Sequence, residues 1–302
     1  MGHTQELDKA LSELKRITGI TLDAKASTPD EIEFALAQIR CLITAYKEKY
    51  NKNHFLSSLM TDSIPSYDIF ERAARLHIDP EIPRILFLLE TRNPLDDTVT
   101  EILKNLFPSQ TKTYLVGITE KTLVILRPLK ASESTDDIQR LALMLIDTLN
   151  TEALAQVRIA YSGTIDTLLD LSGAFRETSL ALQVGRLFYS DQKIFPYNQL
   201  GIGRLIYRLP STVCEQFLGE IFGEDIPGSF DEDLTATINK FFQNNLNIAE
   251  TSRQLHMHRN TLIYRLEQIE KKTGLDIRRF EDAMTYKIAI MVTNYLQTER
   301  TS

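Results

Sequence analysis

The first sixty residues have hydrophobic positions three and four residues apart, the spacing of amphipathic helices. One helix is expected to end at Gly19. A second is expected to begin after Thr28, whose hydroxyl can form a capping box with Glu31. Apolar residues then follow a heptad spacing over nearly three repeats. This stripe could pack within its own domain or form the interface of a dimer through residues 32–50, and three repeats leave both open. The two stripes are Leu7, Leu11 and Leu14, then Ile32, Leu36, Ile39, Ile43, Tyr46 and Tyr50.

From about residue 80, short apolar runs alternate with amphipathic segments, which is typical of a sheet covered by helices. The expected strands are 82–90, 112–118, 122–126, 157–161 and 193–195, and the expected helices are 95–107, 136–149 and 168–189. Thr119-Glu120-Lys121 is a short polar turn, which makes the second and third strands a hairpin. The order strand, helix, two strands, helix, strand, helix, strand predicts an α/β sheet with mixed pairing rather than a sandwich.

The remainder of the chain has no strand pattern. Residues 198–228 are expected to be a helical connection, which includes Pro227-Gly228, and the chain beyond residue 230 is expected to be helical throughout. The fold class is therefore α/β plus all-α. The expected domains are an N-terminal helical segment (1–60), an α/β domain (61–200), a helical linker (201–230) and a C-terminal domain (231–302).

Composition indicates a soluble protein of the cytoplasm. The chain is 43% hydrophobic and 25% charged, as ordinary globular proteins are. It has two cysteines, Cys41 and Cys214, which lie far apart and outside any CxxC pair, so a reducing compartment is expected. The N-terminus lacks the apolar core of a signal peptide, and no apolar run reaches about 18 residues, so no membrane contact is expected.

The net charge of −7 argues against a nucleic-acid partner, but its distribution does not. Residues 234–302 contain ten basic and seven acidic residues, whereas the rest of the chain contains 24 basic and 34 acidic residues. A basic segment attached to an acidic body is a modest indication of a nucleic-acid module. Whether this segment binds nucleic acid must therefore be judged from its local sequence motif.

Residues 247–274 have the pattern of two short helices joined by a tight turn, a helix-turn-helix. Asn247 can cap the first helix, which is expected to run to about Leu255. The second helix is expected from Arg259 to Lys272, with Gly274 as the left-handed residue after its end. Its apolar stripe is Leu262, Leu266 and Ile269.

The first turns of this second helix carry side chains suited to the major groove, where the N-terminal part of a recognition helix lies. Arginine can donate two hydrogen bonds to guanine, and asparagine can pair with adenine, as Arg259 and Asn260 could here. The alternative is an ordinary solvated helix face. The expected DNA-binding residues are Arg253, His258, Arg259, Asn260, Thr261, Tyr264 and Arg265.

Residues 255–292 closely resemble the C-terminal helix-turn-helix of the CdaR/PucR family, the sugar-diacid and purine-catabolism regulators. The resemblance implies a sequence-specific DNA-binding transcription regulator, not an enzyme. It implies a double-stranded DNA operator, a homodimer that matches a two-fold site, and an unidentified small-molecule effector. The matching residues are Leu255, His258, Arg259, Asn260, Thr261, Leu262, Tyr264, Arg265, Leu266, Thr273 and Gly274.

Residues 67–210 are similar to the family's middle domain, a degenerate relative of the diguanylate cyclase (GGDEF) fold. In an active cyclase the hairpin carries two glycines and paired acidic metal ligands, whereas here Gly117 stands alone before the turn. The resemblance therefore implies a GGDEF-like domain without catalysis or cofactor. Some sixty residues precede it, which is too short for the family's diacid-recognition domain, so diacid sensing is not expected.

Other candidate sites are weaker. His256 and His258 lack a nearby cysteine or carboxylate that would complete a metal site, and Gly201-Ile202-Gly203 lacks the third glycine of a dinucleotide motif. Cys214 is expected to be a buried thiol, and Asp136-Asp137 a solvated helix start. Two alternative functions stay open: a nucleotide-binding signalling module with secondary DNA binding, and an interaction scaffold.

Overall fold

The computed structural model describes residues 2–18, 21–22, 28–223 and 232–299. Two predicted features, the helix end at Gly19 and the Pro227-Gly228 pair, lie outside the described residues. The chain forms two compact units, one of residues 1–182 with 193–199 and the other of residues 183–192 with 200–302. In the described part, no helix is both long enough and apolar enough to cross a lipid bilayer.

The first unit begins with two packed helices, α1 (Gly2–Thr18) and α2 (Pro29–Tyr50). The predicted capping box is confirmed, because the Glu31 amide donates to the Thr28 hydroxyl at 3.3 Å and the Thr28 amide donates to the Glu31 carboxylate at 3.1 Å. The first four heptad positions of α2 are buried against α1, so this stripe packs within the chain. The shared core consists of Leu7, Ala10, Leu14, Ile32, Leu36, Ile39 and Ile43.

Two further helices, α3 (Lys52–Met60) and α4 (Ser66–Arg75), lead into a five-stranded sheet of order β2-β3-β1-β4-β5. Neighbouring strands are antiparallel except β4 and β5, which are parallel, so the predicted mixed pairing is confirmed. Phe87 of the central strand lies opposite Ile125 on one side and Tyr161 on the other. The strands are β1 (Arg84–Thr91), β2 (Tyr114–Gly117), β3 (Thr122–Pro128), β4 (Val157–Tyr161) and β5 (Ile194–Pro196).

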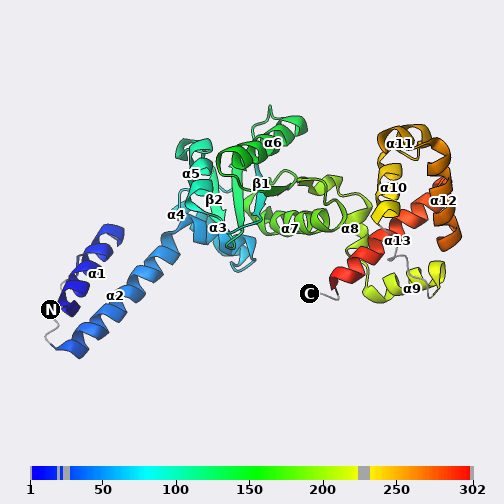
Figure 1. Ribbon diagram of the computed structural model, residues 1–302. Coiled ribbons are helices and arrows are strands. Elements are labelled where there is room, and N and C mark those ends of the chain that lie inside the picture. Colours follow the sequence, from blue (N-terminus) through cyan, green and yellow to red (C-terminus); the bar gives the residue numbers. More distant parts are fainter. Residues whose placement is uncertain (1, 19–20, 23–27, 224–231, 300–302) are drawn as a thin grey trace. The chain divides into compact units, whose positions relative to one another are not determined.

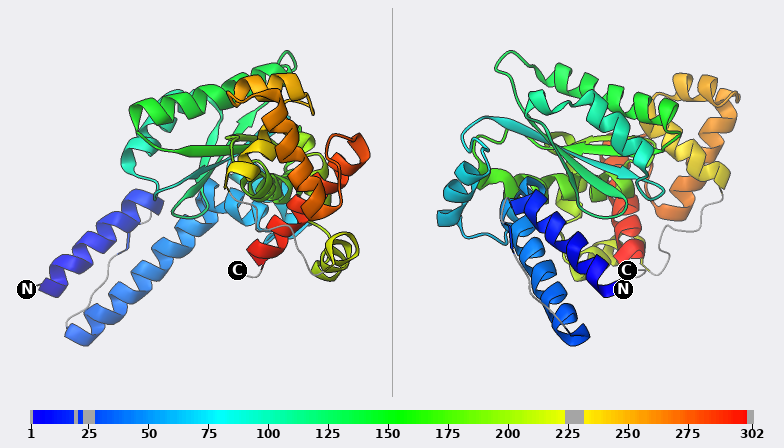
Figure 2. Two further views of the ribbon diagram at one scale, coloured as in Figure 1. Left: turned by 45° about the vertical axis from the view of Figure 1, so that its right-hand side comes forward. Right: turned by 90° about the vertical axis from the view of Figure 1, so that its left-hand side faces the viewer.

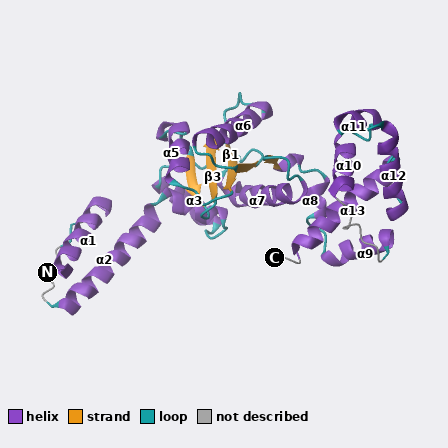
Figure 3. Ribbon diagram, viewed as in Figure 1, coloured by secondary structure: helices purple, strands orange, loops and turns teal. Residues whose placement is uncertain are grey.

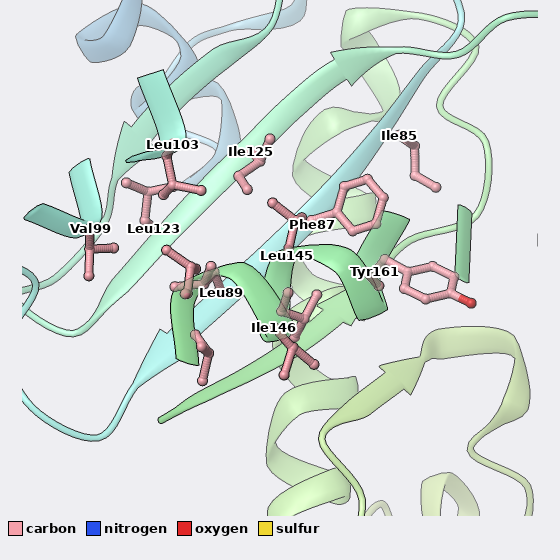
Figure 4. Close-up of a cluster of buried hydrophobic side chains, with 14 residues drawn as sticks. Ile85, Phe87, Leu89, Val99, Leu103, Leu123, Ile125, Leu145, Ile146 and Tyr161 are labelled. Atoms are coloured by element: carbon pink, nitrogen blue, oxygen red, sulfur yellow. The ribbon is translucent and has the colours of Figure 1, made fainter. Parts of the chain in front are cut away.

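The sheet buries one face under α5 (Asp97–Leu106) and α6 (Thr135–Glu152), because alternate side chains of each strand point to that face. Figure 4 shows this core, in which Phe87 and Tyr161 of the sheet lie near Leu145 and Ile146 of α6. Helix α7 (Leu171–Phe188) lies on the opposite side, as the two views in Figure 2 show. Short 3-10 turns occupy Ser109–Thr111, Leu168–Asp170 and Tyr197–Gln199.

The described residues of the second unit contain helices and no strands (Figure 3). Its core has two parts. One lies between α10, α12 and the first half of α13, and the other lies where α8 and α9 pack on the second half of α13, with Cys214 buried as expected. The domain boundaries stay a prediction, but α8 and α9 share a core with α13. The helices are α8 (Ile202–Ile206), α9 (Ser211–Phe222), α10 (Glu232–Gln243), α11 (Ile248–Gln254), α12 (Arg259–Thr273) and α13 (Phe280–Glu299).

Candidate nucleic-acid interface

The turn between α11 and α12 is closed by backbone hydrogen bonds and one left-handed residue (Figure 1). Helix α11 begins where the Asn247 side chain accepts the Glu250 amide at 3.1 Å, as predicted. After it ends, His256 has φ of 52°, a conformation that histidine adopts more readily than most residues. The Met257 amide then donates to the Ser252 carbonyl at 3.0 Å. The chain therefore turns within four residues and starts a second helix.

Helix α12 is fixed by its buried face. Leu262, Leu266 and Ile269 are fully buried, which confirms the predicted stripe. The helix ends at Gly274, whose φ of 73° and amide bond to the Glu270 carbonyl at 2.8 Å confirm the predicted left-handed end. The residues of α10 and α13 that cover this face are Leu234, Ile238, Phe241, Ala283 and Tyr286.

The expected base-contacting side chains gather at the exposed start of α12. His258, Arg259, Asn260 and Thr261 are consecutive and all exposed. Tyr264, one turn further along, is 58% exposed although it is a large aromatic side chain. The structure therefore brings five of the seven predicted residues onto one solvent-facing surface, which we call the α12 front.

His258 has a second role in this arrangement, because it caps the helix. Its Nδ1 atom accepts the Asn260 amide at 3.2 Å. In the neutral ring the proton then lies on Nε2, which leaves an N–H donor at the helix N-terminus. The N-terminus of a helix attracts anions such as phosphate through its backbone amides and its dipole.

Arg265 is held differently, because its guanidinium faces α10. Its Nη1 atom donates to the Thr237 hydroxyl at 2.8 Å and to the Asp233 carbonyl at 3.3 Å. Its Nη2 atom lies 3.7 Å from the Asp233 carboxylate, and the side chain is 28% exposed. Thr237 is itself fully buried. Arg265 thus links the middle of α12 to α10.

Arg253 lies on α11 and remains exposed, but its guanidinium pairs with the Glu250 carboxylate. The same carboxylate accepts a hydrogen bond from the side-chain amide Nε2 of Gln254 at 2.6 Å. Glu250 therefore turns toward the end of α11, and part of the positive charge of Arg253 is neutralised.

Arg278, which follows α12, is a functional candidate that the sequence pattern did not reveal. It donates to Glu270 at 2.7 Å and to Asp276 at 2.5 Å, and it lies 3.8 Å from Glu267. The hydrogen bond between Arg278 and Asp276 raises the pKa of Arg278 above its usual value and lowers the pKa of Asp276. Arg278 thereby compensates the two acidic side chains of α12, which would otherwise repel a phosphate backbone.

The middle domain presents no comparable cluster in its hairpin turn. The Thr119 hydroxyl accepts the Lys121 and Thr122 amides at 3.2 and 3.1 Å, so the turn closes on itself. Across the described residues, no three histidine, cysteine, aspartate or glutamate side chains lie close enough together to hold a metal ion. This holds for the neighbourhood of His256 and His258 as well.

Two family matches together cover more than half of the chain. Residues 61–184 match the GGDEF-like domain, and residues 234–292, which include all of α11 and α12, match the PucR C-terminal helix-turn-helix domain. The helix-turn-helix match, together with the relatives named below, supports a regulator of the CdaR/PucR family. The matches confirm the fold class expected from the sequence, a GGDEF-like α/β domain with N-terminal helices and a C-terminal helix-turn-helix.

Three curated relatives of the chain are named as regulators. The purine catabolism regulatory protein of Bacillus subtilis is 28% identical over 66% of this chain and 38% of its own length. The carbohydrate diacid regulator of Escherichia coli is 23% identical over 86% of this chain and 70% of its own length. The transcriptional activator AdeR of Bacillus subtilis is 21% identical over 68% and 50%, respectively. The chain thus spans between 38% and 70% of the length of these relatives.

Proposed function

We propose that the chain is a sequence-specific DNA-binding transcription regulator and that α12 is its recognition helix. The observation that carries this proposal is the α12 front, in which five polar or aromatic side chains face solvent. The opposite face of the same helix is fully buried. A helix fixed from behind and polar in front can enter the major groove without unfolding its own domain.

Each side chain of the α12 front fits a distinct part of the duplex. Arg259 would donate two hydrogen bonds to guanine O6 and N7, and Asn260 would pair with the edge of adenine. The Nε2–H of His258 and the helix N-terminus would bind a phosphate, which positions the protein without specifying a base. Thr261 and Tyr264 would contact phosphates or a thymine methyl. Arg253 would lie at the rim, and Arg265 would act from behind by holding α12.

The proposed partner, oligomeric state, location and effector follow from similarity to the same family. The proposed partner is a double-stranded DNA operator, which a homodimer would bind in the cytoplasm through two symmetric half-sites. Two of the relatives are named for purine catabolism and for carbohydrate diacids, which supports a small-molecule effector here. We assign no catalytic role to the GGDEF-like domain. The proposed division is residues 1–60, 61–200, 201–230 and 231–302.

Fluorescence anisotropy tests the DNA proposal. The full chain is titrated onto labelled fragments from upstream of its own gene and of neighbouring genes, and onto scrambled DNA, at two salt concentrations. Specific regulators favour their site by about 10³-fold or more, and their affinity falls with salt. Equal binding to all fragments would contradict sequence-specific recognition by this chain under those conditions, and no binding at low salt would contradict DNA binding itself.

A matched pair of variants then locates the interface. Arg259→Ala should weaken binding to the preferred fragment by about 1–3 kcal/mol, because it removes a bidentate base contact. Lys271→Ala changes another exposed cation of α12, about three turns beyond Arg259 at 3.6 residues per turn, and should leave specificity unchanged. Equal affinities for Arg259→Ala and the wild type would show that the α12 front is not the contacting surface.

A further inference from the structure

Helix α2 has a second, mainly apolar face, interrupted by the exposed Gln38, opposite the one that packs on α1. Phe34 is 66% exposed and Leu42 is 50% exposed, and Ala37, Cys41 and Ala45 are exposed as well. At 100° per residue, Phe34, Cys41 and Ala45 fall within about 20° of one line along the helix. This line lies on the far side from the stripe that packs on α1. We call these five residues the outer face of α2.

We propose that the outer face of α2 packs against the same face of a second copy, with the two helices antiparallel. Charge supports this orientation. The first half of α2 contains three acidic residues and no basic residue, whereas the second half contains three basic residues and one acidic residue. An antiparallel pair brings residues 30–33 of each copy level with residues 47–50 of the partner, whereas Arg40 lies at the axis and pairs with Glu6 of its own chain at 3.8 Å. A parallel pair would bring like charges together, which is unfavourable.

Side-chain size supports the same orientation. The large Phe34 lies near one end of the outer face, and the small Cys41 and Ala45 lie toward the other end. In an antiparallel pair, Phe34 of one copy meets the small side chains of the other, so that each large residue enters a gap between small ones. In a parallel pair the two Phe34 rings would meet at the same level and hold the helices apart. A two-fold axis near the middle of α2 places Phe34 of each copy against the small side chains of the other copy.

The other possible occupants of this face are a different protein and a part of this chain outside the first unit. Neither would produce self-association through Phe34. The inference rests on the homodimer of the proposed function but not on DNA recognition by α12, because it concerns the first unit and is tested without DNA. Failure of one proposal therefore does not entail failure of the other.

Sedimentation analysis of the full chain tests the interface. In a two-fold dimer each substitution occurs twice in the interface. Phe34→Glu should therefore raise the dimer dissociation constant about 100-fold, which is about 2.8 kcal/mol at 1.4 kcal/mol per tenfold change. Ser12→Glu is the control, since it places the same charge on the exposed side of α1 and should leave the dimer unchanged. Circular dichroism verifies that both variants keep the wild-type helix content.

The proposal is overturned if the wild-type chain is monomeric at about 100 µM, which lies well above the Kd of ordinary specific interfaces. It is also overturned if Phe34→Glu dimerises as strongly as the wild type. Since Phe34 is mostly exposed within its unit, a loss of helix content is not expected from this change.

Cross-linking tests the orientation in a Cys41→Ser background. Residues 33 and 47 are about 21 Å apart along α2, at 1.5 Å per residue. In an antiparallel pair, residue 33 of one copy lies level with residue 47 of the other. A short bismaleimide should therefore link Glu33→Cys chains to Lys47→Cys chains when the two are mixed and link neither variant to itself. Efficient linking of each variant alone, without linking in the mixture, would establish a parallel pair and overturn the proposed orientation.

Discussion

Replacing Arg265 by alanine should weaken the attachment of α12 to α10 rather than remove a DNA contact. The guanidinium makes a 2.8 Å hydrogen bond to the buried Thr237 hydroxyl and a 3.3 Å bond to the Asp233 carbonyl. Hydrogen bonds to charged groups are worth about 1.5–3 kcal/mol. The Asp233 carboxylate is 87% exposed, so its ion pair adds little. The expected loss of local stability is about 2 kcal/mol.

Hydrogen exchange is the suitable assay, because it reports opening of particular helices in the full chain. A loss of about 2 kcal/mol corresponds to exchange about 30-fold faster in α10 and α12, at 1.4 kcal/mol per tenfold change. Arg259→Ala is the comparison, because this exposed side chain should affect DNA binding and leave exchange within about twofold of the wild type. Thr237→Val combined with Arg265→Ala should show less than the sum of the single effects.

One result would refute this interpretation of Arg265. If Arg265→Ala leaves exchange unchanged but lowers the slope of log affinity against log salt by about 0.9, the side chain neutralises a phosphate in the complex. Arg265 would then belong to the DNA contacts, as the sequence motif alone indicates.

Three further changes test local features. Gly274→Ala should destabilise the end of α12 by about 1 kcal/mol, because φ is 73° there although a Cβ would meet nothing. Gly173→Ala, which also adds a Cβ in open space but within α7, should not destabilise, and thermal melts of both variants compare the two; equal melting temperatures would contradict the backbone explanation. His256→Gly should be neutral or stabilising and His256→Val destabilising by about 1 kcal/mol, since the residue is left-handed; a tolerated valine in the same melts would contradict the turn geometry. The Ser134 hydrogen bonds lower the pKa of Asp137 from 3.8 to about 2. The ionised Asp137 carboxylate should therefore stabilise α6 fully above about pH 5 and lose this effect as the pH falls through about 2, so acid titrations of the wild type and Asp137→Asn should differ at neutral pH and converge below pH 2.

Local signals in the sequence predicted the elements that depend on neighbouring residues. The capping box at Thr28 and the glycine at 274 act within one helical turn, so their spacing alone indicates a helix start and a helix end. The buried stripe of α12 could be predicted because its apolar residues recur at the spacing of a helix. The order of strands and helices predicted the mixed sheet, because few topologies fit it.

Contacts between distant residues could not be predicted in this way. Arg265 and Thr237 are 28 residues apart, and nothing in the spacing of either helix pairs them. The heptad stripe of α2 is a second example. Periodicity shows which face of a helix is apolar, but not whether the partner is α1 or a second copy. The packing of α8 and α9 on α13 was likewise missed, since a short helical stretch between two domains has the same pattern as a linker.

The boundary between the two compact units has a consequence for modularity. It falls at residue 182 inside α7, and the chain enters the first unit again for residues 193–199. A chimaera joined at residue 200 would leave behind Leu187 and Phe188, which pack on the core formed by α8, α9 and α13. The smallest piece that can be exchanged intact is therefore larger than the helix-turn-helix, because it must include the C-terminal part of α7.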